Sequence, residues 1–140
     1  PSEINGAIGI QQLKKLNKFL KQRNKNAKLF KSLFSNSDLL SIQRETGESS
    51  WFGFALVLKG KLKNKREKLI KLLNKNNIET RPIVAGNFLK NPVIKFIDHR
   101  KSGKMKNADY IHKNGFFVGN DHRDLSNQLK LLKKIIEDFA

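Results

Sequence analysis

Apolar residues recur every three or four positions through residues 4–34, with one wider gap after Leu20. Lysines fill most of the positions between them. This period places the apolar side chains on one stripe and predicts a single long amphipathic helix. Gly6 and Gly9 fall in its first turns, where each glycine costs about 1 kcal/mol of helix stability relative to alanine. Small residues there suggest close packing against a partner that the rest of the chain does not obviously supply.

Three other segments have the length and composition of β-strands. Residues 51–58 form an apolar, aromatic run that predicts a central strand, and residues 115–120 predict a short strand between glycines. Residues 78–84 alternate well enough to form a third strand. Pro82 lies inside that segment and has no N–H group to donate, so we expect an edge strand or a bulge. Residues 35–49 are polar and irregular and are expected to form a loop.

Two further helices complete the pattern. Residues 63–77 carry leucines and isoleucine on one side, and residues 124–139 carry an apolar face that begins after a capping Asp124. Residues 85–115 lack long periodicity, apart from one or two helical turns around 107–112. The order helix, strand, helix, strand, long loop, strand, helix predicts a short, mostly antiparallel sheet flanked by a long N-terminal and a C-terminal helix, which is an α+β fold. The 140 residues fit one domain, residues 1–140.

The net charge of +17 raises the possibility of a nucleic-acid partner. The excess comes from 23 lysines against 6 arginines, in a chain that also contains 15 asparagines. Arginine is the preferred residue for bidentate phosphate and base contacts, and the lysines are spread along every predicted helix. We therefore favour a compositional bias over a nucleic-acid site. The absence of cysteine excludes disulfides and thiolate metal sites within this chain and suits a cytoplasmic protein. No apolar run approaches the roughly 20 residues of a membrane span.

Most familiar catalytic patterns are absent. The three histidines, His99, His112 and His122, are too far apart in sequence to suggest a shared metal ion. The chain has no glycine-rich phosphate-binding motif and no recognisable Ser-His-Asp arrangement. We therefore predict neither a catalytic residue nor a metal ligand in this chain.

One segment, Arg81-Pro82-Ile83-Val84-Ala85-Gly86-Asn87-Phe88, has the composition of a binding site. Arg81 follows a predicted strand, where its guanidinium could hold a phosphate or a carboxylate. Gly86 permits a turn or the close approach of a ligand, and Asn87 adds an amide that both donates and accepts hydrogen bonds. The alternative is structural: Arg81 could form an ion pair with Glu79 or Asp98. The residues alone leave both interpretations open.

Several segments resemble one enzyme family, the DegT/StrS family of PLP-dependent sugar aminotransferases. Residues 3–13, followed by Arg23, resemble the long helix that follows the catalytic domain throughout the family. A narrower resemblance, to the nucleotide-linked 4-keto-6-deoxyhexose 3-dehydratases of lipopolysaccharide and deoxysugar synthesis, rests on residues 49–54, 79–88, 107–109 and 115–120. The resemblance covers essentially the whole chain, and the Arg-Pro-Ile-x-Ala-Gly-Asn-Phe block is its most specific part.

The resemblance implies that residues 1–140 are the small C-terminal domain of a fold-type I PLP enzyme. A large upstream domain would bind pyridoxal 5'-phosphate or pyridoxamine 5'-phosphate and would carry the cofactor-anchoring lysine, or the histidine that replaces it in the dehydratases. Neither the cofactor nor its anchor is expected in this chain, which we predict to be inactive alone. The chain begins at Pro1, directly before a helical pattern, and we interpret it as a piece of a longer protein.

The same resemblance implies a function and a set of substrate contacts. The complete enzyme would remove the 3-hydroxyl of a nucleotide-linked sugar in the cytoplasm, and it would be a homodimer with active sites at the subunit interface. The substrate-binding residues would be Arg81, Gly86, Asn87, Asn120 and His122. His122 stands in Asn-Asp-His, whereas the family pattern is Asn-His. A sugar-nucleotide aminotransferase of the same family and a basic nucleic-acid-binding module remain as alternatives.

Overall fold

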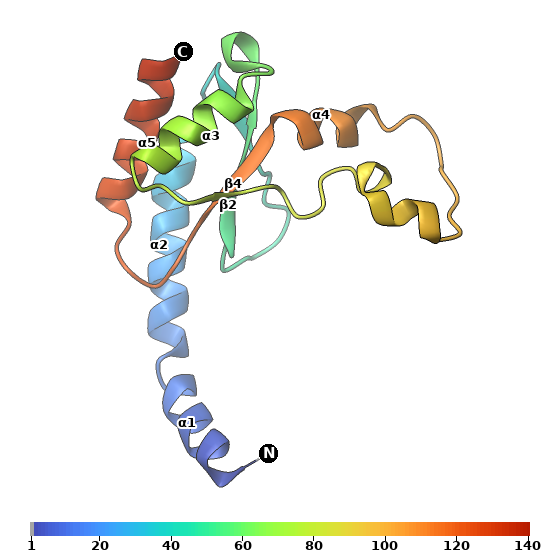
Figure 1. Cartoon of the computed structure of the whole chain (residues 1–140). Helices are drawn as coiled ribbons and strands as arrows, with labels where there is room; N and C mark the ends of the chain where they lie inside the picture. Colours follow the sequence, from blue (N-terminus) through green and yellow to red (C-terminus); the bar gives the residue numbers. More distant parts are fainter. Residues whose placement is uncertain (1) are drawn as a thin grey trace.

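The computed structural model describes residues 2–140. Its helices and strands follow one another along the chain in the arrangement shown in Figure 1. The α-helices are α1 (Glu3–Leu13), α2 (Leu16–Phe34), α3 (Arg66–Lys75), α4 (Lys106–Asn114) and α5 (Ser126–Phe139). The strands are β1 (Leu40–Ile42), β2 (Gly53–Leu58), β3 (Thr80–Arg81) and β4 (Gly115–Gly119). Short 3-10 helices span Gly60–Leu62, Phe88–Lys90 and Pro92–Phe96.

The strands form one antiparallel sheet in the order β1-β2-β4-β3. In the central pair, Phe54 lies opposite Val118 and Leu56 lies opposite Phe116. β3 lies at the edge of the sheet, as Pro82 led us to expect, and Arg81 lies opposite Phe117. The sheet and its helices confirm the predicted α+β class.

The hydrophobic core lies between one face of the sheet and the pair α2 and α5, which run side by side in Figure 1. Alternate residues of β2 point into it, because successive side chains of a strand face opposite ways. Phe54 is fully buried, and its ring stacks on Phe30 of α2 with centroids 4.3 Å apart. Burying one such side chain contributes roughly 1.5–3 kcal/mol, so this layer holds both long helices on the sheet.

The predicted single helix over residues 4–34 is wrong in one respect, because the helix breaks at Lys14 and Lys15. α2 buries Ala27, Phe30 and Phe34 against the core, whereas α1 buries none of its residues. No core contact holds α1 in line with α2. The apolar side chains of α1 are therefore exposed. Ile4 is 71% exposed and Leu13 is 68% exposed.

The strand predictions also need two corrections. Residues 35–49 contain β1, so the sheet has four strands where the sequence predicted three. With only three residues, β1 is too short to show a period in the sequence. The strand predicted over 78–84 shortens to Thr80–Arg81, because Pro82 cannot donate to a ladder and the chain then turns, with the Gly86 N–H donating to the Ile83 carbonyl at 2.8 Å.

The long connection after β3 forms an extension that we call the arm, residues 84–105. Figure 1 shows the arm standing apart from the helices and sheet, with α4 leading back from it to β4. Much of its apolar surface is uncovered, including Val84 at 87% and Phe96 at 86% exposure. No helix described for residues 2–140 combines the length and the apolar character needed to cross a bilayer.

Candidate functional site

The second face of the sheet is covered at one end only. α4 covers the end of the sheet near Leu58, where the Tyr110 hydroxyl donates to the Leu58 carbonyl at 2.9 Å. At the other end Gly53 of β2 pairs with Gly119 of β4, so no side chain from either residue covers the backbone there. A hollow of about 250 Å³ opens at this end. It is lined by Phe52, Glu79, Arg81, Phe117, Gly119 and Asn120, and we call it the sheet hollow.

Two aromatic rings form one wall of the sheet hollow. Phe52 is 79% exposed, and its centroid lies 6.2 Å from that of Phe117, with the ring planes tilted by 48°. Gly53 makes room for the second ring, because a Cβ there would lie 2.8 Å from Cδ2 of Phe117. The wall therefore offers aromatic surface to an incoming planar group.

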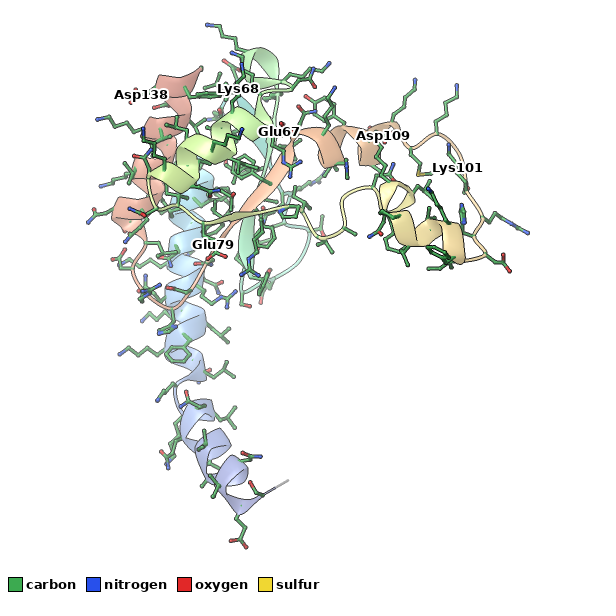
Figure 2. The ribbon with its side chains drawn as sticks, viewed as in Figure 1. Glu67, Lys68, Glu79, Lys101, Asp109 and Asp138 are labelled. Atoms are coloured by element: carbon green, nitrogen blue, oxygen red, sulfur yellow. The ribbon has the colours of Figure 1, made fainter. Side chains whose placement is uncertain are left out.

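Arg81 supplies the cation of the sheet hollow. Its Nε and Nη2 donate to Oε1 of Glu79 at 3.1 and 2.9 Å, which is the ion pair that the sequence offered as the structural alternative. Glu79 is labelled in Figure 2, where it lies at the middle of the molecule beside the sheet. Both side chains are more than two-thirds exposed. An exposed pair of this kind contributes only about 0–1 kcal/mol, so an anionic ligand can replace Glu79 at little cost.

Asn120 borders the sheet hollow, but its amide is already engaged. Nδ2 donates to the Trp51 carbonyl at 2.9 Å and to the Arg23 carbonyl at 3.2 Å. Oδ1 accepts from Nδ2 of Asn26 at 3.1 Å. Asn120 is only 7% exposed, so these bonds fix the backbone around it. Its predicted contact with substrate stays a prediction.

Gly86 and Asn87 lie elsewhere, at the base of the arm. The Asn87 side chain donates to Oδ1 of Asp109 at 2.9 Å and accepts from the Leu89 N–H at 3.1 Å. The Asn87 N–H donates to Nδ1 of His112 at 3.3 Å. Gly86 has a φ of +60°, and a Cβ there would lie 2.5 Å from the same Nδ1. These contacts attach the arm to α4, and a substrate role for the two residues stays a prediction.

An ion pair strengthens this attachment. Nζ of Lys90 lies 2.8 Å from Oδ1 of Asp109, and both Lys90 and Asn87 favour the ionised carboxylate. The hydrogen bond from Lys90, followed by that from Asn87, therefore lowers the pKa of Asp109 below its ordinary value. The base of the arm thus contains a charged pair that holds the 3-10 turn against α4.

His122 occupies a third position. Its ring centroid lies 4.3 Å from that of Phe19 on α2, and the residue is exposed. It does not line the sheet hollow. Of the five predicted residues, the structure therefore brings Arg81 and Asn120 together, pairs Gly86 with Asn87 at the arm, and leaves His122 apart.

Sequence reasoning missed Phe52 and Phe117 as parts of the site. Both lie in apolar runs that predict strands, and alternation places Phe52 on the same face as the buried Phe54. The structure differs because Trp51 has a φ of +52°, which interrupts the alternation before β2 begins. No pattern in the sequence predicts a left-handed backbone conformation at Trp51.

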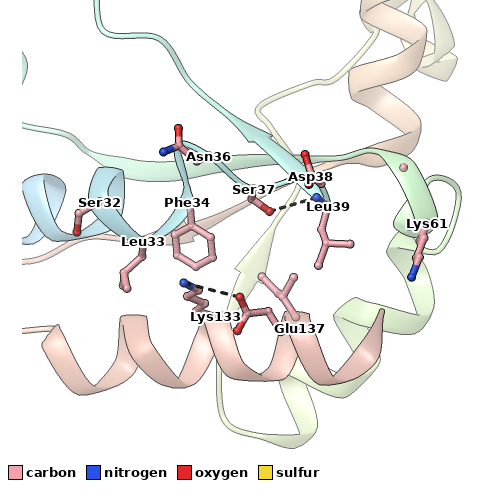
Figure 3. Close-up of a pocket in the computed structure, with 12 residues that line it drawn as sticks. Ser32, Leu33, Phe34, Asn36, Ser37, Asp38, Leu39, Lys61, Lys133 and Glu137 are labelled. Carbon is pink, nitrogen blue, oxygen red and sulfur yellow. Dashed lines mark hydrogen bonds and ion pairs between the residues drawn. The ribbon is translucent and has the colours of Figure 1, made fainter.

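A larger groove, of about 630 Å³, shares no residue with the sheet hollow (Figure 3). It lies between the end of α2 and α5, where Oγ of Ser37 accepts from the Leu39 N–H at 3.2 Å and Lys133 faces Glu137 at 3.7 Å. Its charged groups are of both signs and lie on flexible side chains. The groove therefore lacks the convergent polar groups typical of a binding site.

Across residues 2–140 no lysine is buried, and no group of three histidine, aspartate or glutamate residues is placed to hold a metal ion. A lysine that anchors a carbonyl cofactor needs an enclosed site that lowers the pKa of its amine, so that the neutral form is available. The sheet hollow does offer groups suited to binding, namely the cation of Arg81 and the two aromatic rings of Phe52 and Phe117.

Comparison with known proteins places the chain in a class. The family model described as the DegT/DnrJ/EryC1/StrS aminotransferase family matches residues 2–127, and the chain belongs to that family. Among its relatives, the chain is 54% identical over 138 residues to the GDP-4-keto-6-deoxy-D-mannose 3-dehydratase of Yersinia pseudotuberculosis, which covers 98% of this chain. It is 32% identical over 121 residues, or 84% of the chain, to the lipopolysaccharide biosynthesis protein RfbH of Salmonella typhimurium, and those residues span 28% of RfbH.

A solved structure agrees with the fold. The crystal structure of a GDP-4-keto-6-deoxymannose-3-dehydratase with a trapped PLP-glutamate geminal diamine superposes with a TM-score of 0.89 at 46% identity. The match covers 97% of this chain and 36% of that one. The chain likewise spans 35% of the length of the Yersinia relative. The activity and substrates of these proteins therefore belong to molecules about three times as long.

Proposed function

We propose that this chain is the substrate-side C-terminal domain of an enzyme that removes the 3-hydroxyl of GDP-4-keto-6-deoxy-D-mannose for lipopolysaccharide synthesis. The observation that carries the proposal is the 54% identity to the Yersinia dehydratase along nearly the whole chain. The sheet hollow supports it, because a cation beside two aromatic rings suits the phosphates and base of a nucleotide sugar.

In this proposal a preceding domain binds pyridoxal or pyridoxamine phosphate, which supplies an electron sink for the elimination. The residues of this chain bind and orient the sugar nucleotide. Arg81 exchanges Glu79 for an anionic group of the substrate, and the sheet hollow, at about 250 Å³, forms a subsite for part of the ligand. Pockets for whole ligands are typically about 300–1,000 Å³, so the rest of the site must come from other residues. A homodimer in the cytoplasm, with sites at the subunit interface, belongs to the same proposal.

A chimera tests this directly. The matching C-terminal third of the Yersinia dehydratase is replaced by residues 2–140 of this chain, and conversion of GDP-4-keto-6-deoxy-D-mannose is measured with PLP and glutamate. We expect turnover within about tenfold of the unaltered Yersinia enzyme, because this chain is 54% identical to the segment that it replaces. The isolated chain serves as the control and should show none. A chimera that folds and binds PLP but leaves the sugar unchanged would refute the proposal.

The product distinguishes the alternative within the family. An aminotransferase would transfer nitrogen from glutamate to the sugar, whereas a dehydratase leaves a sugar without nitrogen and without the 3-hydroxyl. Mass analysis of the chimera's product separates the two outcomes. The other alternative, a nucleic-acid-binding module, draws its support from the net charge of +17 and is tested by the salt dependence of binding.

A further inference from the structure

Trp51 adopts a backbone conformation that tryptophan rarely occupies. Its φ of +52° lies in the left-handed region, where a bulky side chain costs of order 1–3 kcal/mol. Such a conformation persists only where the surrounding structure enforces it, and enforced strain of this kind concentrates at functional sites. The contacts of Trp51 show what enforces it.

Two side chains hold the Trp51 backbone from the carbonyl side. Nη2 of Arg23 donates to the Trp51 carbonyl at 2.8 Å, and Nδ2 of Asn120 donates to the same oxygen at 2.9 Å. Nε of Arg23 also donates to the preceding carbonyl, that of Ser50, at 2.9 Å. Arg23 therefore binds two consecutive carbonyls with one rigid guanidinium, which lysine cannot reproduce.

The Trp51 side chain is held as well. It is 4% exposed, its indole N–H donates to Oε1 of Glu45 at 2.8 Å, and its ring lies 5.9 Å from that of Phe54. With the indole fixed in the core and the carbonyl fixed by Arg23 and Asn120, the next residue has no place in the core. Phe52 is consequently turned outward to 79% exposure, over the sheet hollow.

We propose that Arg23 and Asn120 are positioning residues that hold Trp51 in its left-handed conformation and thereby present Phe52 as a stacking platform for the base of the nucleotide sugar. This inference rests on the proposed function for the identity of its ligand. An exposed aromatic ring tilted against a second one, beside an arginine with exchangeable partners, is suited to hold a planar heterocycle next to a phosphate.

The test uses the chimera and its steady-state kinetics with the GDP-linked sugar. Phe52→Leu keeps an apolar side chain but removes the ring face, and we expect KM to rise about tenfold with kcat within about twofold, because stacking acts on binding. Phe52→Tyr keeps the ring and should retain the original KM. Phe96→Leu is the matched control, because Phe96 is also a highly exposed phenylalanine but lies on the arm, and it should leave KM unchanged.

Arg23→Gln tests the positioning role, because Arg23 does not line the sheet hollow. We expect it to raise KM severalfold alone and to add nothing in the Phe52→Leu background, since it acts through Phe52. Additive effects would overturn the positioning role, and an unchanged KM in Phe52→Leu would overturn the platform. Thermal unfolding verifies that every variant is folded. If the unaltered chimera has no turnover, the proposed function fails, and calorimetric affinities of the same variants for GDP decide this inference separately.

Discussion

Residues with positive φ mark where this fold departs from its own regular pattern. Trp51 and Val84 do so without being glycine or asparagine, at the sheet hollow and at the start of the arm. Asn64 and Asn77 also have positive φ, but asparagine tolerates that region. Trp51 lies within residues 49–54 and Val84 within residues 79–88, two of the segments that carry the family resemblance. Local strain and candidate function coincide at single residues.

Gly86 provides a prediction at this scale. Gly86→Ala should destabilise the chain by about 1–3 kcal/mol, because alanine meets both a left-handed backbone and the His112 ring. The change is measured by denaturant unfolding. Gly103→Ala is the control: Gly103 has a φ of +66°, but nothing lies within 4 Å of an added Cβ, so only the backbone cost of roughly 1 kcal/mol applies. Equal losses in the two variants would contradict a role for the His112 contact.

Glu45 provides a prediction about pH. The hydrogen bond from Lys31, and then that from the Trp51 indole, lower the pKa of Glu45 below its ordinary value of 4.5. Because the folded pKa is depressed, the stabilisation is complete above about pH 4.5 and is lost as pH falls through the folded pKa. Glu45→Gln keeps an acceptor for the indole but should flatten the unfolding free energy between pH 5 and 3. Glu48→Gln removes a carboxylate of the same loop that forms no ion pair among the described residues, and it serves as the matched control. A slope that persists in Glu45→Gln would contradict the prediction.

Among the helices and strands, the predictable ones are those in which the hydrophobic period repeats over enough residues to be recognised. α2, α5 and β2 follow from buried positions that repeat at helical or strand spacing, such as Phe30, Phe34 and Phe54. The break between α1 and α2 could not be predicted, because it falls at Lys14 and Lys15, where no glycine or proline signals the end of a helix. β1 could not be predicted either, since its three residues gain their structure from pairing with β2.

The site shows the same division. Arg81 is found by its motif, and Glu79 is one of the two ion-pair partners that the sequence offered. Phe52 is not found, because its exposure depends on Arg23 and Asn120, which are 28 and 69 residues from Trp51 along the chain. A strand pattern reports which residues alternate. It gives no information about a contact with a residue far along the chain, such as that of the Arg23 guanidinium with the Trp51 carbonyl.

α1 gives the prediction for an element. It buries no residue, and helices of about this length are marginal in water, so in the isolated chain α1 should open readily. Its amide hydrogens should exchange near the rate of an unstructured peptide, whereas those of α5 exchange far more slowly. The double variant Gly6→Ala, Gly9→Ala should slow the exchange of α1, because each change favours the helix by about 1 kcal/mol and meets no neighbour within 4 Å. Equal protection of α1 and α5 would show that α1 has a partner within the chain.

The charge of the whole molecule separates two explanations of its basic surface. A dedicated nucleic-acid site concentrates its cations, whereas a compositional bias spreads them. Here the 29 lysines and arginines are spread over α2, α3, α4, α5, the arm and the connecting loops, with none in α1. A focused site that contacts 6–10 phosphates loses about 10³–10⁵ in affinity between 50 and 200 mM salt. We expect a loss of about hundredfold or less, which corresponds to fewer than about four simultaneous phosphate contacts.

Fluorescence anisotropy with one short DNA duplex at the two salt concentrations measures this loss, and paired variants locate its origin. Lys18→Gln with Lys21→Gln removes two charges from α2, and Lys130→Gln with Lys134→Gln removes two from α5. With a dispersed charge, both pairs should weaken binding at low salt by the same factor, since each removes the same share of a diffuse field. A focused site would make one pair far more damaging than the other. Equal losses would assign the lysines to a dispersed field, and the role proposed for Arg81 rests on a different observation, its position beside two rings at an open sheet face.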